Sequence, residues 1–171
     1  MQQLSVFEIF DLSLSPDIDQ QQLNREYARL ILENHPDKFI NATTDIKQLS
    51  QDNTAAINHA YHILSTPIKV YEYIINNSQS NNESVISDDA EIFDVMQLYE
   101  DLYEIDTIKG CQTLHNIVQK LYIEKSLVVR ERIVAQEIML AQQHMHKLQL
   151  ISKLLERVSS KQLELELFQI K

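Results

Sequence analysis

The chain has 171 residues and a net charge of −10, and 44% of its residues are hydrophobic. This acidic balance argues against nucleic-acid binding, because contacts to phosphates need a basic surface. One Gly and three Pro are too few turn formers for a β-sandwich or barrel, so we expect an all-α fold. The start of the chain lacks a signal-peptide pattern and no segment could span a membrane, which predicts a cytoplasmic protein.

Four helices are predicted in the first half of the chain. They cover about residues 5–12, 19–34 and 45–64, and a segment that begins at Pro67. Asp19 followed by Gln22 is typical of a helix start, because the Asp side chain accepts from free amides of the first turn. Pro36 disfavours helical geometry at the residue before it, so the second helix should end near Asn34.

A polar segment separates this half from the second. Residues 76–84 contain no apolar side chain and are rich in turn formers, which predicts a linker over 76–88 between domains at 1–75 and 89–171. A helix is expected over 89–105, ended by Gly110. From Cys111 onward the pattern stays helical without Gly or Pro. One rod of that length would reach about 90 Å, so we predict a turn near 131–137 and a three-helix antiparallel bundle. An unbroken, coiled-coil-like helix is the alternative.

The tripeptide His35-Pro36-Asp37 lies in the predicted loop between two long helices. A loop at the end of a rigid hairpin presents its side chains to a partner. Alone, three residues could belong to an ordinary loop. Their context is more informative, because the element Asn58-x-Ala60-Tyr61-x-x-Leu64-x-x-Pro67 follows at the distance that a second long helix requires.

Together these features make residues 6–75 resemble a J-domain. That family stimulates ATP hydrolysis by DnaK-type chaperones, and its essential contact is the His-Pro-Asp tripeptide. The resemblance assigns the chaperone contact to His35, Pro36, Asp37, Arg25, Arg29 and Lys38. J-domains usually carry more basic residues before the tripeptide, whereas the last helical turn here is Leu32-Glu33-Asn34. Electrostatic steering should therefore be weaker, which favours a dedicated chaperone over a general one.

The helix expected over 89–105 has two apolar faces. At 100° per residue, Val95, Leu98, Leu102 and Ile105 share one sector, while Phe93, Met96, Glu100 and Glu104 lie nearly opposite and Ile92 between. The second face is either a docking surface or is covered by the linker or the first domain. Residues 70–108 contain ten Asp or Glu and no Lys, Arg or His, which predicts a basic partner surface.

The whole chain resembles the HscB family of co-chaperones for iron–sulfur cluster assembly, in its bacterial type. Residues 98–105 look like the helix with which that family binds the cluster scaffold IscU. The resemblance assigns scaffold binding to Ile92, Phe93, Met96, Gln97, Glu100, Glu104 and Leu150. Gln97 replaces an acid, and Leu150 stands where an aromatic residue can be found. The implied partners are IscU and the DnaK-type ATPase HscA, with no cofactor and no metal.

Two other functions are alternatives for this sequence. The pairs His59/His62 and Cys111/His115 each share a helical side, but two ligands make at most a partial metal site, and no activated nucleophile or phosphate loop supports an enzyme. The other alternative is a J-domain co-chaperone for a different client, whose C-terminal bundle serves for dimerisation or other docking. A single Cys excludes an internal disulfide and a cysteine zinc cluster.

Overall fold

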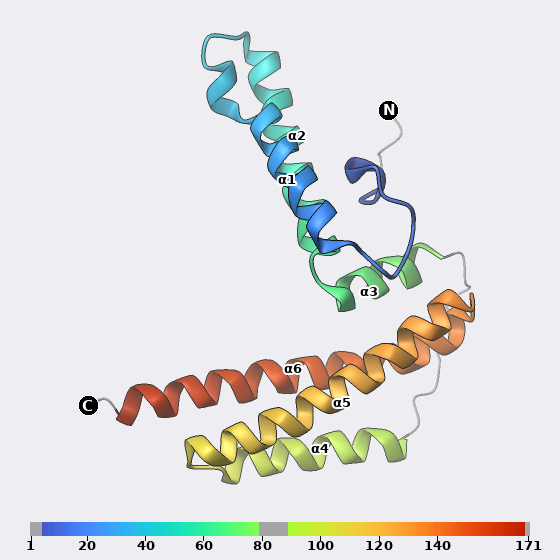
Figure 1. Ribbon diagram of the computed structural model, residues 1–171, viewed down its shortest axis with the longest axis vertical. Coiled ribbons are helices and arrows are strands. Elements are labelled where there is room, and N and C mark those ends of the chain that lie inside the picture. Colours follow the sequence, from blue (N-terminus) through green and yellow to red (C-terminus); the bar gives the residue numbers. More distant parts are fainter. Residues whose placement is uncertain (1–4, 79–88, 170–171) are drawn as a thin grey trace. The chain divides into compact units, whose positions relative to one another are not determined.

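The computed structural model describes residues 5–78 and 89–169. These residues form helices and turns, without a strand in the described ranges, and the chain divides into two compact units, Met1–Ile74 and Ile75–Lys171 (Figure 1). The predicted fold class, an all-α J-domain followed by a C-terminal three-helix bundle, is confirmed. No helix within the described part of the chain is both long and apolar enough to cross a membrane.

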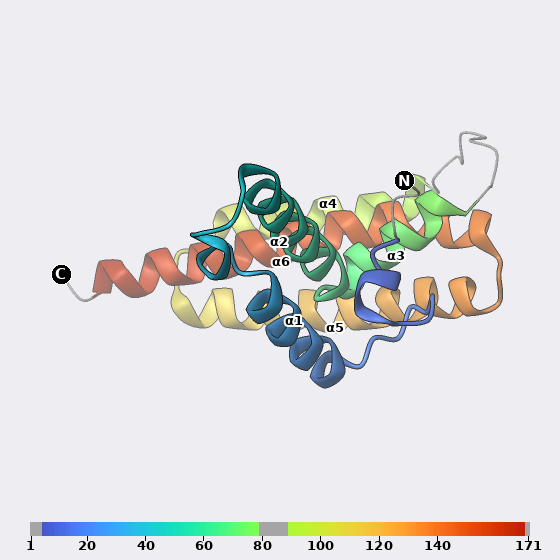
Figure 2. The ribbon, with the colours of Figure 1, turned by 90° about the horizontal axis from the view of Figure 1, so that it is seen from above.

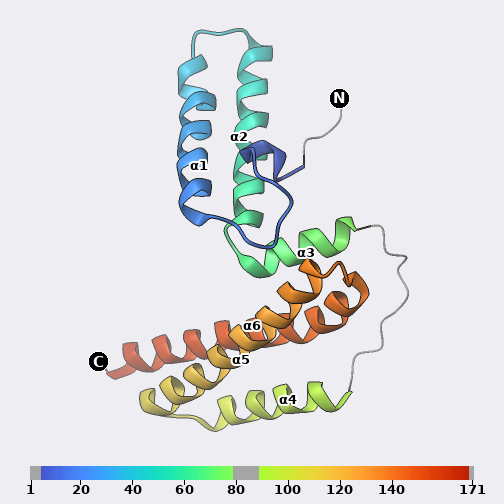
Figure 3. The same ribbon diagram turned by 45° about the vertical axis from the view of Figure 1, so that its right-hand side comes forward.

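The first unit is built around a helical hairpin. Its helices in chain order are η1 (Glu8–Phe10), α1 (Gln20–Asn34), η2 (Pro36–Phe39), α2 (Thr44–Leu64) and α3 (Pro67–Asn77). α1 and α2 run antiparallel, joined at one end by the loop that contains η2 (Figure 3). α3 includes the first two residues of the predicted linker, and residues 79–88 of that linker lie outside the described residues. The domain boundaries therefore stay a prediction.

Both ends of α1 follow from the sequence as predicted. The Asp19 carboxylate accepts hydrogen bonds from the amides of Gln21 (2.9 Å) and Gln22 (3.1 Å), which satisfies two of the free donors of the first turn. At the other end His35 takes an extended conformation, with φ −61° and ψ 129°. This is the geometry that a following proline favours, and α1 ends at Asn34.

The helix predicted over 5–12 is wrong in length and type. Only the 3₁₀ turn η1 forms there. Ser5 and Glu8 bond each other's backbone amides, Ser5 N to Glu8 Oε2 at 2.7 Å and Glu8 N to Ser5 Oγ at 3.3 Å. The turn then ends at Asp11, which has a φ of 52° in the left-handed region. The buried Phe7 and Phe10 still face the interior of the unit.

Polar pairs connect α1 to α2 on one side of the hairpin. The Tyr27 hydroxyl donates to Asn58 Oδ1 (3.0 Å), and the Tyr61 hydroxyl donates to Asn24 Oδ1 (2.8 Å). The two tyrosine rings stack with their centroids 4.0 Å apart. The buried apolar residues of the two helices are Leu23 on α1 and Ile57, Ala60 and Leu64 on α2.

The second unit consists of α4 (Asp89–Glu104), α5 (Ile108–Val134) and α6 (Ile138–Gln169), which lie side by side (Figure 1). The turn predicted within 131–137 is confirmed at 135–137, where Gln136 has a φ of 60° (Figure 2). The unbroken helix is thereby excluded. The bundle buries a continuous apolar core of Val95, Leu102, Leu114, Val118, Ile151, Leu154 and Val158.

Gly110 does not end α4, contrary to the prediction. It lies in the first turn of α5, where its amide donates to the Thr107 side chain at 3.1 Å. A Cβ at Gly110 would come within 2.9 Å of the side chains of Ile105 and Thr107, so glycine permits the close approach of α4's end to α5. The next residue, Cys111, is fully buried, and this burial raises the pKa of its thiol.

Candidate functional site

The tripeptide His35-Pro36-Asp37 lies at the end of the hairpin with its side chains open to solvent. The side chain of His35 is 50% exposed and that of Asp37 is 81% exposed. Pro36 opens η2, at a position that needs no amide donor. His35 Nδ1 accepts from the Asp37 amide at 3.3 Å, which leaves Nε2 to donate to a partner. The tripeptide is therefore a small ordered structure whose polar groups face outward.

Asn34, one residue before the tripeptide, is attached to α2 by three hydrogen bonds. Its backbone carbonyl accepts from Ser50 Oγ (2.6 Å) and Thr54 Oγ1 (3.1 Å), and its Oδ1 accepts from Asn53 Nδ2 (3.0 Å). A carbonyl in the last turn of a helix has no partner within that helix, so α2 supplies the donors. Sequence reasoning missed these residues, although two hydroxyl residues spaced by four on a helix could have suggested them.

The three cations assigned to the chaperone contact are not equally available. Arg25 and Lys38 are exposed. Arg29 is bound on its own helix by Glu26 (2.8 Å) and Glu33 (3.0 Å). Both acids raise the pKa of the Arg29 guanidinium, chiefly through the Glu26 hydrogen bond. α1 therefore presents less positive charge to a partner than its number of basic residues suggests.

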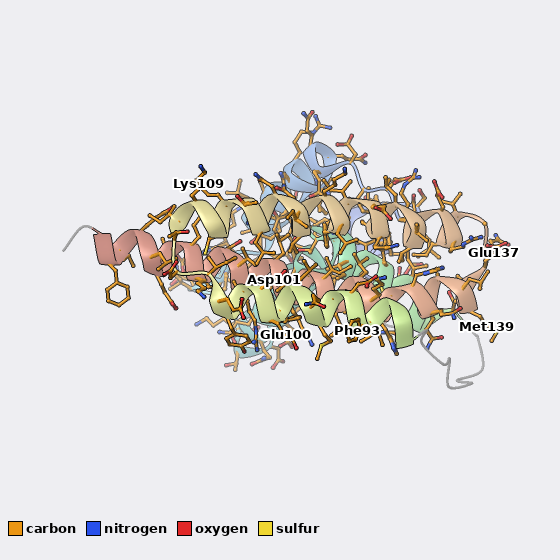
Figure 4. The ribbon with its side chains drawn as sticks, turned by 90° about the horizontal axis from the view of Figure 1, so that it is seen from below. Phe93, Glu100, Asp101, Lys109, Glu137 and Met139 are labelled. Carbon is orange, nitrogen blue, oxygen red and sulfur yellow. The ribbon has the colours of Figure 1, made fainter. Side chains whose placement is uncertain are left out.

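The residues assigned to scaffold binding lie on the outer side of the second unit. Val95 and Leu102 are buried in the bundle core, whereas Phe93 is 67% exposed and Met96 53% exposed. Figure 4 shows Phe93 and Glu100 along one edge of α4, with Asp101 on another side of the helix. Of the remaining assigned residues, Gln97, Glu100 and Glu104 are exposed, and Ile92 and Leu150 are half-buried.

A groove of about 500 Å³ runs between α4 and α6. It brings together two of the assigned residues, Met96 and Leu150, from segments far apart in the sequence. The rest of its lining was not identified from the sequence and comprises Tyr99, Tyr103, Lys153, Glu156 and Arg157. Phe93, Gln97, Glu100 and Glu104 do not line it.

Three contacts hold α4 beside α6 along this groove. The Tyr99 hydroxyl donates to the Leu150 carbonyl at 3.3 Å, and the Arg157 guanidinium lies 5.7 Å from the centroid of the Tyr99 ring. Burial raises the pKa of Tyr99, and Arg157 opposes that shift. Lys161 Nζ donates to the carbonyls of Leu102 and Tyr103. A cation is favourable at this position, because the carboxyl end of α4 carries the negative end of the helix dipole.

The histidine and cysteine pairs form no cluster of three metal-ligating side chains within the residues described. His62 contacts Lys69 Nζ, and His115 Nδ1 lies 3.4 Å from Ser159 Oγ. Cys111 is enclosed in the bundle core.

Comparison with known proteins gives consistent results. Residues 8–73 match the DnaJ domain family. A co-chaperone protein HscB homolog of Shewanella halifaxensis is 32% identical over 121 residues, which are 70% of this chain and 68% of that protein. A homolog of the same name from Colwellia psychrerythraea is 30% identical over 105 residues, and the match covers 60% of each chain.

The fold also matches a solved structure, that of the chaperone HscB from Vibrio cholerae. The TM-score is 0.85 at 22% identity, and the match covers 95% of this chain and 99% of the other. The DnaJ match and the similarity to Shewanella halifaxensis HscB over two thirds of its length show that the chain belongs to the HscB family of J-domain co-chaperones.

Proposed function

We propose that this protein stimulates the ATPase of a dedicated DnaK-type chaperone, HscA, and delivers the iron–sulfur scaffold IscU to it. The observation that carries the proposal is the presence of two ordered, exposed surfaces on two separate units of one chain. One is the tripeptide at the hairpin end, and the other is the outer face of α4 with the groove beside it.

The hairpin end supports the chaperone contact. His35 and Asp37 are exposed, while the bonds from Asn34 to α2 fix the backbone that carries them. Pre-organised side chains lose little conformational entropy on binding. With Arg29 bound by two acids, Arg25 and Lys38 are the cations expected to meet an acidic ATPase surface.

The outer face of α4 supports scaffold binding. Phe93 and Met96 are large apolar side chains exposed on a helix whose opposite side is buried, which suits contact with the apolar surface of a partner. Joining both surfaces in one chain raises the effective concentration of the scaffold at the chaperone. Delivery of the scaffold, rather than bond chemistry, would then be the protein's contribution.

The test is a steady-state ATPase assay of HscA with this protein, with and without IscU. The wild type is expected to raise the rate, and more so when IscU is present. His35→Gln should abolish the stimulation without unfolding the protein, because the side chain is half-exposed. Retained stimulation by this variant would contradict the chaperone contact.

The scaffold contact is tested separately by direct titration with IscU. Phe93→Ala combined with Met96→Ala should abolish IscU binding and leave the stimulation by the free protein intact. Normal binding by this double variant would instead favour a different client, with the bundle used for dimerisation or other docking.

A further inference from the structure

We propose that the groove between α4 and α6 selects a protein segment that carries an apolar side chain flanked by charges of opposite sign. Lys153 and Arg157 would bind the carboxylate side of that segment. The inference rests on the proposed function, because the segment is taken to belong to the scaffold. It adds specificity residues on α6 to the apolar and acidic residues of α4.

Apolar and aromatic side chains of both helices line the groove, and its charged lining residues all lie on α6. Met96, Tyr99 and Leu150 line it, and a volume of about 500 Å³ accommodates one or two large side chains of a partner. On the α4 side, Glu100 and Glu104 continue the exposed face that carries Phe93, as Figure 4 shows for Glu100.

The α6 border carries the opposite charge. Leu150, Lys153 and Arg157 are spaced by three and four residues, so they share one side of the helix. Both cations line the groove and are exposed. Glu156 borders the groove as well, which leaves two cations and one anion on this side.

Lys153 and Arg157 form no ion pair with any of the residues that the structure describes. Two like charges four residues apart are unfavourable to a helix by themselves. Arg157 is partly oriented by the Tyr99 ring, whereas no residue that the structure describes forms an ion pair with Lys153. Both ammonium and guanidinium groups are therefore available to a carboxylate of the bound segment.

Reversing the charge of Lys153 and Arg157 should change the affinity in opposite directions for two modes of docking. If docking used only the acidic face of α4, the partner surface would be basic, and Lys153 and Arg157 would repel it. Replacing them by Glu would then tighten binding. If these cations instead bind a carboxylate of the partner segment, the same replacement weakens binding.

The experiment measures the Kd for purified IscU of the wild type, Lys153→Glu and the double variant Lys153→Glu/Arg157→Glu, at low and high salt. We expect Lys153→Glu to raise the Kd about threefold and the double variant about tenfold at low salt. High salt should reduce these differences, since it screens exposed charges. Lys120→Glu is the matched control for Lys153→Glu, because Lys120 is exposed on α5 and the change in net charge is the same as in that single variant. Its Kd should equal that of the wild type.

Two results would overturn the inference. If the charge variants bind IscU as tightly as the wild type or more tightly, while Phe93→Ala weakens binding, the α6 cations play no part and the proposed function stands. If the wild type does not bind IscU at all, the proposed function and this inference both fail. Circular dichroism of each variant confirms that a weaker Kd reflects the interface and not unfolding.

Discussion

In the first unit, the hairpin end is held by hydrogen bonds, such as those from Ser50 and Thr54 to the Asn34 carbonyl. In the second unit, α4 is held mainly by apolar side chains, with Val95 and Leu102 buried against α5 and α6. The hairpin buries few large side chains between α1 and α2, and the bundle buries a continuous row of them along its length.

The difference matches what each unit presents. A tripeptide at a loop needs its backbone fixed at one point, and hydrogen bonds are directional enough to do this. A helix face needs a whole helix kept in one orientation, which a long apolar contact on the opposite side provides. Core substitutions should therefore affect the stabilities of the two units separately.

The largest effect is expected from Ile151→Ala in the bundle core. Ile151 is fully buried, and its truncation should lower the free energy of unfolding of the second unit by about 2–5 kcal/mol. Amide hydrogen exchange should show faster exchange in α4 to α6 and unchanged protection in α1 and α2. Ile117→Ala, at a side chain 51% exposed on α5, should change the free energy by less than about 0.5 kcal/mol. Equal losses in both units would contradict the separation.

The next effect concerns the hairpin end. Ser50→Ala combined with Thr54→Val removes both hydroxyl donors to the Asn34 carbonyl, which should destabilise the first unit by about 2 kcal/mol. Hydrogen exchange of α1 and α2 measures the loss. Ser159→Ala is the control, since that hydroxyl bonds only within α6 and with His115 on an exposed surface. An unchanged first unit would show that the polar contacts do not hold the hairpin end.

Asp19 at the start of α1 should contribute less. Asp19→Ala removes the acceptor for two amides, and the expected loss is about 1 kcal/mol of unfolding free energy. Asp19→Asn keeps an acceptor at the same position and should stay close to the wild type. Thermal unfolding of the three proteins ranks their stabilities. A loss as large for Asp19→Asn as for Asp19→Ala would rule out capping as the cause.

The smallest change in stability is expected when Arg29 is released. Glu26→Gln with Glu33→Gln removes two solvent-screened ion pairs, so the unfolding free energy should stay close to that of the wild type. If HscA is the partner, as proposed, its association rate should nevertheless rise about threefold at low salt, because a free guanidinium adds steering toward an acidic surface. Glu131→Gln with Glu164→Gln, in the second unit, changes the net charge equally and should leave that rate unaltered.

Short-range features of the fold could be predicted from the sequence. Asp19 and Pro36 define the ends of α1 because a side-chain cap and a proline act within one helical turn. The exposed and buried sides of α4 follow from the 100° spacing of its residues. The helix predicted over 5–12 does not form, because Ser5, Glu8 and the left-handed Asp11 favour a tight turn.

Features that depend on helix pairing could not be predicted. Leu49 and Ile46 have the spacing of a core face, yet they are 59% and 45% exposed, because α1 has ended before it could cover them. The position of Lys153 and Arg157 in a groove could not be predicted either, because it depends on the packing of α4 beside α6. The ion pairs of Arg29, in contrast, could have been predicted, because Glu26 and Glu33 lie three and four residues from it on the same helix.

The enclosure of Cys111 has a practical consequence. It is the sole thiol of the chain, it is fully buried, and its raised pKa reduces the thiolate fraction at neutral pH. An alkylating reagent should therefore modify the native protein only during openings of the bundle. The rate of modification therefore reports the frequency of those openings and does not respond to motion of the hairpin. Binding of the proposed scaffold partner to α4 should lower this rate.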